Sequence, residues 1–236
     1  MAIDRNVPAV PRRDVPSSIR WAVLAAAVAT AVVAPVAGRW FALRSSSDGA
    51  GWMAFAAMAI VGFAIVGWAA RWDRRSLGLR LRPTPSLRFW LVVGLIGGAV
   101  ILALALLLLA LAHRGGADPF DLGGQRATCS SAARIVQMLV LAPIFEELLY
   151  RLVLCTALRW VAGNRAAVLG GGAAFAWPHW YAGVLGPDNL IAGFFFSWAF
   201  VRSETLLVPV AFHFVGNWVV IALNDSGLLG PCVPVP

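Results

Sequence analysis

The sequence predicts an all-α, polytopic helical membrane protein with about seven transmembrane segments, six to eight being compatible with it. Hydrophobic residues make up 60% of the 236 residues and charged residues only 13%, whereas soluble domains contain about 45 to 50% and about 25%. The apolar residues also form long runs, and about 20 such residues cross a bilayer as a helix. The chain is therefore too apolar for an ordinary soluble domain.

The basic residues fit the same prediction. All nineteen are arginines, the formal net charge is +8, and the arginines cluster between the apolar runs. Short cytoplasmic loops of membrane proteins are enriched in arginine and lysine. No aromatic and basic face or binding motif of a nucleic-acid-binding protein accompanies the charge. We therefore expect a lipid bilayer, and no nucleic acid, among the partners.

Three clear spans come first, at about Trp21–Ala37, Gly51–Ala70 and Phe89–Ala112. The first is longer than the apolar part of a signal peptide, so we expect it to stay uncleaved. The loop Arg71–Arg88 carries six arginines against one aspartate. The excess predicts that this loop and the N-terminus are cytoplasmic, in an integral protein of a bacterial plasma membrane.

Four further segments follow a polar stretch, at about 132–161, 166–181, 190–201 and 206–223. The second and third of these are short for full spans. They can be tilted, re-entrant or covered by neighbouring helices, as irregular elements inside a membrane must be. The run Gly170–Gly172 lies inside an apolar segment, where small residues let helices approach closely.

The first of these four segments contains Glu146 and Glu147, two of only three glutamates in the chain, and Arg151. A charged side chain at bilayer depth costs roughly 2.5 to 3.5 kcal/mol. On a helix Glu147 and Arg151 lie on one face, where an ion pair lowers that cost. Glu146 points about 100° away and can face a cavity as a general base or acid. The alternative is that both glutamates only stabilise the helix bundle.

Two later segments carry histidines in apolar surroundings. Phe175 and His179 are four residues apart, and Pro178 predicts a kink that leaves His179 at a break beside a polar cavity. The alternative for His179 is an interfacial aromatic belt. His213 and Asn217 share one helix face and are candidate oxyanion donors, or else an interhelical hydrogen-bonding pair.

These are the groups that a hydrolase active site requires: Glu146 as the base, His179 as its proton-handling partner, and His213 with Asn217 as oxyanion donors. The chain has no GxSxG turn and no HExxH sequence, so a serine hydrolase or a zincin is poorly supported. The main non-enzymatic alternative is a proton-coupled transporter with Glu146 and His179 as the relay. Related halves, as expected of many transporters, are not visible.

These residues form three motifs that resemble those of a known family. EExxxR, FxxxH and HxxxN occur in that order, each in a hydrophobic segment, at Glu146/Glu147/Arg151, Phe175/His179 and His213/Asn217. This pattern is similar to that of the CPBP intramembrane proteases, the CAAX protease and bacteriocin-processing (Abi) family, including type II CAAX prenyl endopeptidases. The match spans about Ala132–Leu223.

The resemblance implies an intramembrane endopeptidase in which Glu146 and His179 activate a water while His213 and Asn217 stabilise the oxyanion. It implies supporting roles for Glu147 and Arg151 on the catalytic helix, with Phe175 as part of the second motif. We expect no cofactor, although Glu146, His179 and His213 would also make a zinc set. The expected partner is a protein or peptide substrate at the membrane, prenylated in some members and a bacteriocin or other peptide in others.

The sequence then divides into a disordered cytoplasmic tail at 1–19, N-terminal transmembrane helices at 20–131, a catalytic core at 132–224 and a C-terminal tail at 225–236. A catalytically silent relative acting as an immunity or adaptor protein is a further alternative. The oligomeric state is left open, as is a disulfide between Cys129 and Cys232, which the predicted topology places on the same side of the membrane.

Overall fold

The computed structural model describes residues 15–45, 48–115, 131–182 and 187–225, and these are almost entirely helical. No strand occurs in these ranges; one isolated bridge pairs Leu79 with Thr205. The all-α prediction is therefore confirmed. Most of the two predicted tails, and both Cys129 and Cys232, lie outside the described residues.

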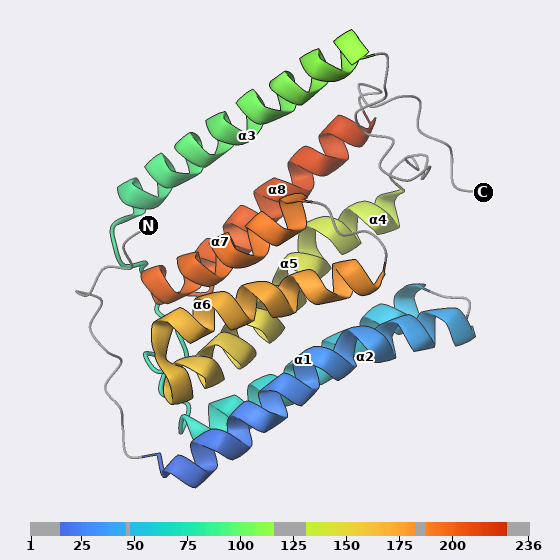
Figure 1. Ribbon diagram of the computed structural model, residues 1–236. Helices are drawn as coiled ribbons and strands as arrows, with labels where there is room; N and C mark the ends of the chain where they lie inside the picture. The colour runs from blue at the N-terminus through green and yellow to red at the C-terminus, as the bar shows by residue number, and fades with distance from the viewer. Residues whose placement is uncertain (1–14, 46–47, 116–130, 183–186, 226–236) are drawn as a thin grey trace. The chain divides into compact units, whose positions relative to one another are not determined.

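Helices occur at every segment where the sequence predicts one (Figure 1). Their bounds are α1 Ser17–Ser45, α2 Asp48–Ala69, α3 Leu87–Gly115, α4 Ala132–Val136, η1 Gln137–Leu141, α5 Ala142–Glu147, η2 Leu148–Cys155, α6 Thr156–Tyr181, α7 Pro187–Ser203 and α8 Leu207–Asp225. The elements from α4 to α6 follow one another without a gap. The two η elements are π-helices, a form that is rare and often found at functional sites.

Two of the described helices are long and apolar enough to cross a membrane: Ser17–Ser45 and Gly49–Ala69. Shorter apolar helices of the described residues cover Leu87–Val100 and Leu207–Ala222. Length and composition thus support transmembrane character for the first part of the chain. They do not establish the predicted number of spans.

Contacts between helices divide the chain into two units, Met1–Thr84 with Ala142–His213, and Pro85–Leu141 with Phe214–Pro236. In the first unit α1 and α2 pack against each other, and both contact η2 (Figure 1). Helix α6 packs against α1, α7 and η2. The element η2 is therefore surrounded by α1, α2, α6 and α7, and all of its residues except Leu148 are buried.

Small residues make these close approaches possible. A Cβ added at Gly51 of α2 would lie 2.5 Å from the carbonyl oxygen of Gly38 in α1. On α6, a Cβ at Gly171 would lie 2.3 Å from Cys155 Sγ, and one at Gly172 would lie 2.4 Å from the Phe194 ring. The glycine run in α6 thus allows close packing against α7 and η2, as the sequence predicts.

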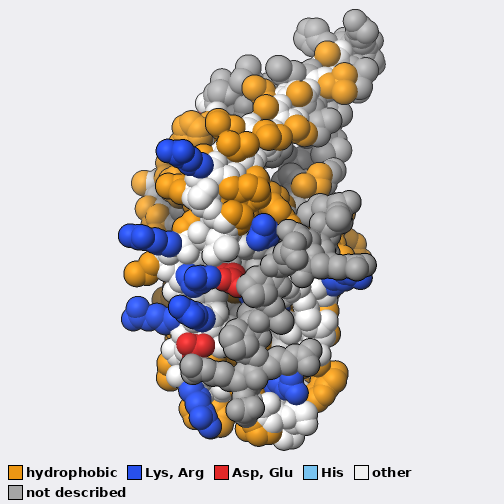
Figure 2. Space-filling view, turned by 90° about the vertical axis from the view of Figure 1, so that its left-hand side faces the viewer, with side chains coloured by type: hydrophobic (Ala, Val, Ile, Leu, Met, Phe, Trp, Pro, Cys, Tyr) orange, Lys and Arg blue, Asp and Glu red, His pale blue; other side chains and the backbone are white. Residues whose placement is uncertain are grey.

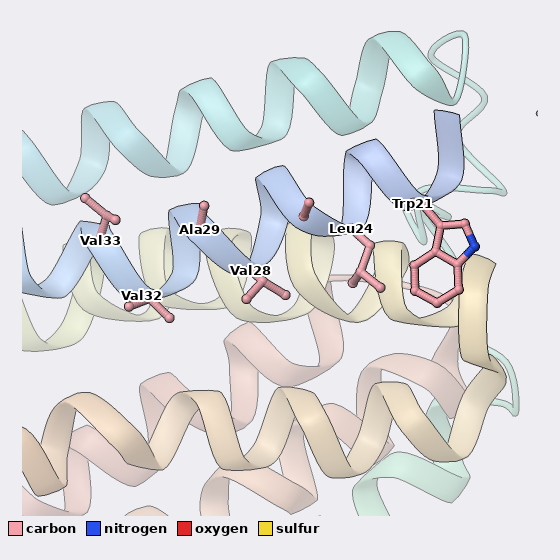
Figure 3. Close-up of a pocket in the computed structure, with 7 residues that line it drawn as sticks. Trp21, Leu24, Val28, Ala29, Val32 and Val33 are labelled. Carbon is pink, nitrogen blue, oxygen red and sulfur yellow. The ribbon is translucent and has the colours of Figure 1, made fainter. Parts of the chain in front are cut away.

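The outward face of α1 is apolar. Trp21, Val28, Val32 and Val33 are exposed, and they line a shallow groove along the helix (Figure 3). The inward face carries alanines such as Ala27 and Ala31, which are almost fully buried. Small residues inward and large apolar residues outward are the pattern expected of a helix that faces lipid, because lipid tails solvate large apolar side chains.

A sharp break divides α6 at Gly163, where φ is 83° and ψ is −176°. This backbone conformation is essentially confined to glycine. The break lies between two of the predicted segments, one that ends near Val161 and one that begins near Ala166. The predicted break at Pro178 is wrong, because α6 continues through Pro178 to Tyr181. A proline this close to the end of a helix removes one backbone donor without ending the helix.

Arginines gather at one end of the first unit, where α1 begins, α2 ends and α7 ends (Figure 2). This basic end comprises Arg20 in the first turn of α1, Arg71, Arg74, Arg75, Arg80 and Arg82 in the loop after α2, Arg202 in the last turn of α7, and Arg159 beside Trp160, whose carbonyl accepts a hydrogen bond from Arg20. The loop after α2 is fastened there to the turn after α7. Arg80 forms an ion pair with Glu204, and the backbone N–H of Thr84 donates to the carbonyl of Ser203 at 2.9 Å.

The second unit contains α3, α4, η1 and the part of α8 that follows His213. Ser131 caps α4, its hydroxyl accepting a hydrogen bond from the backbone N–H of Arg134 at 3.2 Å. Serine at this position satisfies a backbone donor that the first turn of a helix leaves unpaired. The cap sets the beginning of the helical run that continues through η1.

Candidate active site

A fully buried ion pair lies at the centre of the first unit. Arg151 Nε donates to Glu147 Oε2 at 2.7 Å, and Arg151 Nη2 donates to Glu147 Oε1 at 3.3 Å. Neither side chain is exposed. The pair joins α5 to η2 at the i,i+4 spacing from which the sequence predicts it. Because each charge is buried, each depends on the other to offset the loss of its hydration.

His213 of α8 binds the same carboxylate, its Nδ1 lying 2.9 Å from Glu147 Oε1. A carboxylate paired with arginine can only accept hydrogen bonds, so Nδ1 of His213 carries the hydrogen. The neutral ring then presents a lone pair at Nε2. The protonated ring presents an N–H there, and its positive charge lies against Glu147. Neither this contact nor its effect on the tautomer can be read from the HxxxN motif.

Arg151 has two further partners on α6 and α7. Its Nη1 donates to the carbonyl of Gly171 at 3.3 Å and to Ser197 Oγ at 3.2 Å. Ser197 is fully buried and itself donates to the carbonyl of Gly193 at 2.9 Å. Ser197 is not among the residues that the sequence motifs predict. The available signal was a hydroxyl in the otherwise aromatic run FFFSWAF of α7.

Aromatic rings hold the guanidinium and the imidazole in place. The guanidinium carbon of Arg151 lies 4.8 Å from the Phe175 ring centroid and 5.7 Å from that of Phe196, within the range of a cation–π contact. His213 stacks on Phe196 at 5.2 Å with an interplanar angle of 25°. It meets Phe175 edge-on at 5.8 Å. Phe175, predicted as a supporting residue, therefore contacts both members of the network.

His179 contacts this cluster through Phe175. Its ring centroid lies 5.0 Å from that of Phe175, and its Nδ1 lies 2.9 Å from the Phe175 carbonyl oxygen. A carbonyl can only accept, so Nδ1 again carries the hydrogen and the neutral ring presents a lone pair at Nε2. Both histidines of the first unit are thus held in the same tautomer.

Glu146 differs from Glu147 in its surroundings. Glu147 is fully buried, whereas Glu146 is partly exposed. Among the described residues Arg151 and His213 form their ion pairs with Glu147, and Glu146 forms none. Its carboxyl still interacts electrostatically with His213 and His179. The first unit therefore brings Glu147, Arg151, Phe175, His179 and His213 together, and Glu146 directly precedes Glu147 on α5.

Asn217 belongs to the second unit and lies one helical turn after His213 on α8. Its Nδ2 donates to the carbonyl of Met138 in η1 at 2.7 Å. An amide group carries two N–H hydrogens, so this bond uses one of them. The sequence analysis did not foresee the contact with Met138, which lies 79 residues away.

No cluster of three or more His, Cys, Asp or Glu side chains arranged to hold a metal ion occurs within residues 15–45, 48–115, 131–182 and 187–225. The two Nε2 lone pairs and the Glu146 carboxylate are nevertheless groups that bind zinc in proteins. A histidine that ligates a metal also commonly donates its other N–H to a carboxylate or carbonyl. By their chemistry alone, Glu146, His179 and His213 could therefore act either as proton acceptors or as zinc ligands.

Residues 128–219 match the family model described as type II CAAX prenyl endopeptidase Rce1-like. No curated protein and no solved structure matches the chain. The matched residues are less than half of the chain, and they include all three sequence motifs. Residues 128–219 are thus similar to Rce1-like CAAX proteases, the family that the motifs resemble.

Proposed function

We propose that this protein is an intramembrane endopeptidase of the glutamate type, which hydrolyses a peptide bond of a prenylated or otherwise membrane-associated protein. The observation that carries the proposal is the different placement of the two adjacent glutamates. Glu147 is buried and bound by Arg151 and His213. Glu146 is partly exposed and is left for chemistry beside the two histidines.

In the proposed reaction, Glu146 and His179 hold the attacking water. The Nδ1–H of His179 is engaged by the Phe175 carbonyl, so its Nε2 accepts one hydrogen of the water while Glu146 accepts the other. Glu146 takes the proton as the water oxygen bonds to the scissile carbonyl carbon. It then returns that proton to the leaving amine as the carbon–nitrogen bond breaks.

His213 and Asn217 stabilise the oxyanion in this proposal. With Nδ1 bound to Glu147, His213 can donate from Nε2 only as an imidazolium. Asn217 donates the amide hydrogen that Met138 does not use. Donors aimed at a developing oxyanion in a water-poor site typically contribute roughly 100- to 1,000-fold to the rate.

We further propose that catalysis needs no metal, with Glu146, His179 and His213 acting on protons and not as zinc ligands. Dialysis of the purified protein against a chelator should leave the cleavage rate unchanged, and added zinc should not increase it. The check is an activity assay paired with elemental analysis of the same sample. Loss of activity with the metal and its return with zinc would reverse this assignment in favour of a zinc site.

We also propose about seven spans, with the N-terminus and the basic end in the cytoplasm of a bacterium. The arginines of the basic end contrast with only Arg39 and Arg44 in the C-terminal part of α1, and arginine-rich loops stay in the cytoplasm. A tag at the N-terminus should be protected from protease in spheroplasts and accessible in inverted vesicles. A tag at the C-terminus should show the reverse pattern, and equal patterns would mean an even number of spans.

The proteolytic function is tested with the full chain in liposomes and a farnesylated peptide that ends in a CaaX sequence. Mass spectrometry should show cleavage after the prenylated cysteine. The same peptide without the lipid should be cleaved more slowly, because it does not partition into the bilayer. Cleavage of neither peptide, with the protein shown to be folded, would favour a silent adaptor or immunity protein.

A further inference from the structure

Tyr150 has a buried hydroxyl that the network described above leaves without a partner. The side chain is 1% exposed, and its Oη has no hydrogen-bond partner in the structure. An unpaired buried hydroxyl is unfavourable and rare enough in native proteins to need an explanation. The ring itself is well packed, meeting Phe175 edge-on with centroids 5.5 Å apart.

The position of Tyr150 relates this hydroxyl to the active site. It follows Glu146 by four residues, so the two side chains project from the same side of the continuous helical run. Its ring contacts Phe175, whose ring also meets His179 and His213. The charged groups that act on the Tyr150 hydroxyl include Glu146, Arg151 and Glu147.

Other buried donors and acceptors without partners do not share this position. Thr156 Oγ1 is also unpaired and 1% exposed, but it lies where η2 gives way to α6, ten residues beyond Glu146. Arg20 Nε and Arg159 Nη2 are unpaired at the basic end. Within the described residues, Tyr150 is thus the unpaired buried group whose ring contacts Phe175, the residue that also contacts both histidines.

We propose that Tyr150 is a positioning residue of the active site, its hydroxyl donating through one ordered water to the carboxylate of Glu146. A water bridging two polar groups is nearly as favourable as a direct hydrogen bond. The bridge fixes the rotation of the Glu146 carboxyl group, so that one oxygen faces the tyrosine and the other faces the attacking water. The hydroxyl acts through Glu146 and does not touch the substrate.

The kinetic consequence rests on the proposed proteolysis. Tyr150→Phe removes only the hydroxyl, and it should lower kcat for the farnesylated CaaX peptide about tenfold with KM unchanged, as expected for loss of one hydrogen bond to a charged group. Thermal stability should be unchanged or higher. Thr156→Val is the matched control, because it removes another unpaired buried hydroxyl, and it should keep the wild-type kcat. Equal kcat values for wild type and Tyr150→Phe would contradict the proposal.

A second measurement does not depend on activity. The chain has only two tyrosines, so Tyr181→Phe leaves Tyr150 as the single tyrosine. With tyrosine labelled by ¹³C at Cζ, the resonance should move when Glu146→Gln is added and stay in place when Thr156→Val is added. A resonance indifferent to Glu146→Gln would overturn the inference, whether or not the peptide is cleaved. A shift in a protein that cleaves no peptide would support the bridge and contradict the proteolytic function alone.

Discussion

Replacing Glu146 with glutamine should lower the cleavage rate of the farnesylated peptide by about 100- to 10,000-fold, the usual contribution of a general base. Glutamine keeps the size and one acceptor oxygen of the side chain but cannot take a proton. Because Glu146 is partly exposed and makes no ion pair among the described residues, the variant should fold with wild-type stability. Steady-state kinetics and thermal unfolding of the same preparation measure both quantities.

The third glutamate provides the control for this experiment. Glu204 pairs with Arg80 at the basic end. Glu204→Gln also removes one negative charge, but at a residue outside the three motifs. We expect a cleavage rate within a few-fold of wild type, because an ion pair that is partly exposed contributes little. A Glu146→Gln protein that cleaves at the rate of Glu204→Gln would exclude Glu146 as the base.

The second large effect is expected on stability. Arg151→Met should lower the free energy of unfolding by about 3 to 5 kcal/mol, because it leaves the Glu147 carboxylate buried without its main cation. The cation–π contacts with Phe175 and Phe196 are lost as well. Unfolding by denaturant in mixed micelles, followed by the fluorescence of the eleven tryptophans, measures the change.

A double-mutant cycle separates the ion pair from the shape of the side chain. Adding Glu147→Gln to Arg151→Met should recover part of the lost stability, since the uncompensated charge is then gone. Arg82→Met at the exposed basic end is the control and should change the stability by less than about 0.5 kcal/mol. If Arg151→Met were no worse than Arg82→Met, the buried pair would not be a structural requirement.

Sequence patterns predict the helices well because local rules determine them. The apolar runs locate the seven helical segments, and the i,i+4 spacing of Glu147 and Arg151 predicts their ion pair, since helix geometry alone brings such residues together. The difference between Glu146 and Glu147 follows from the same geometry. Both the ion pair and the difference between the two glutamates concern neighbouring residues of one helix.

The remaining features depend on contacts between distant segments. His213 reaches Glu147 across 66 residues, and Arg151 reaches Ser197 across 46. No periodicity in one segment encodes such pairings. The π-helix η2 and the unpaired hydroxyl of Tyr150 likewise become visible only once η2 is packed among its neighbours. The error at Pro178 has a local cause, because a proline in the last turn of a helix need not end it.

The central claim is that Glu146, His179, His213 and Asn217 act on one peptide bond. The most direct test is an experimental structure of the Glu146→Gln protein with the farnesylated peptide bound. We expect the scissile carbonyl oxygen to lie within hydrogen-bonding distance of His213 Nε2 and Asn217 Nδ2. The substituted glutamine side chain and His179 should be within one water of the carbonyl carbon. A separation of more than about 10 Å between these side chains, or a peptide bound elsewhere, would contradict a single hydrolytic centre.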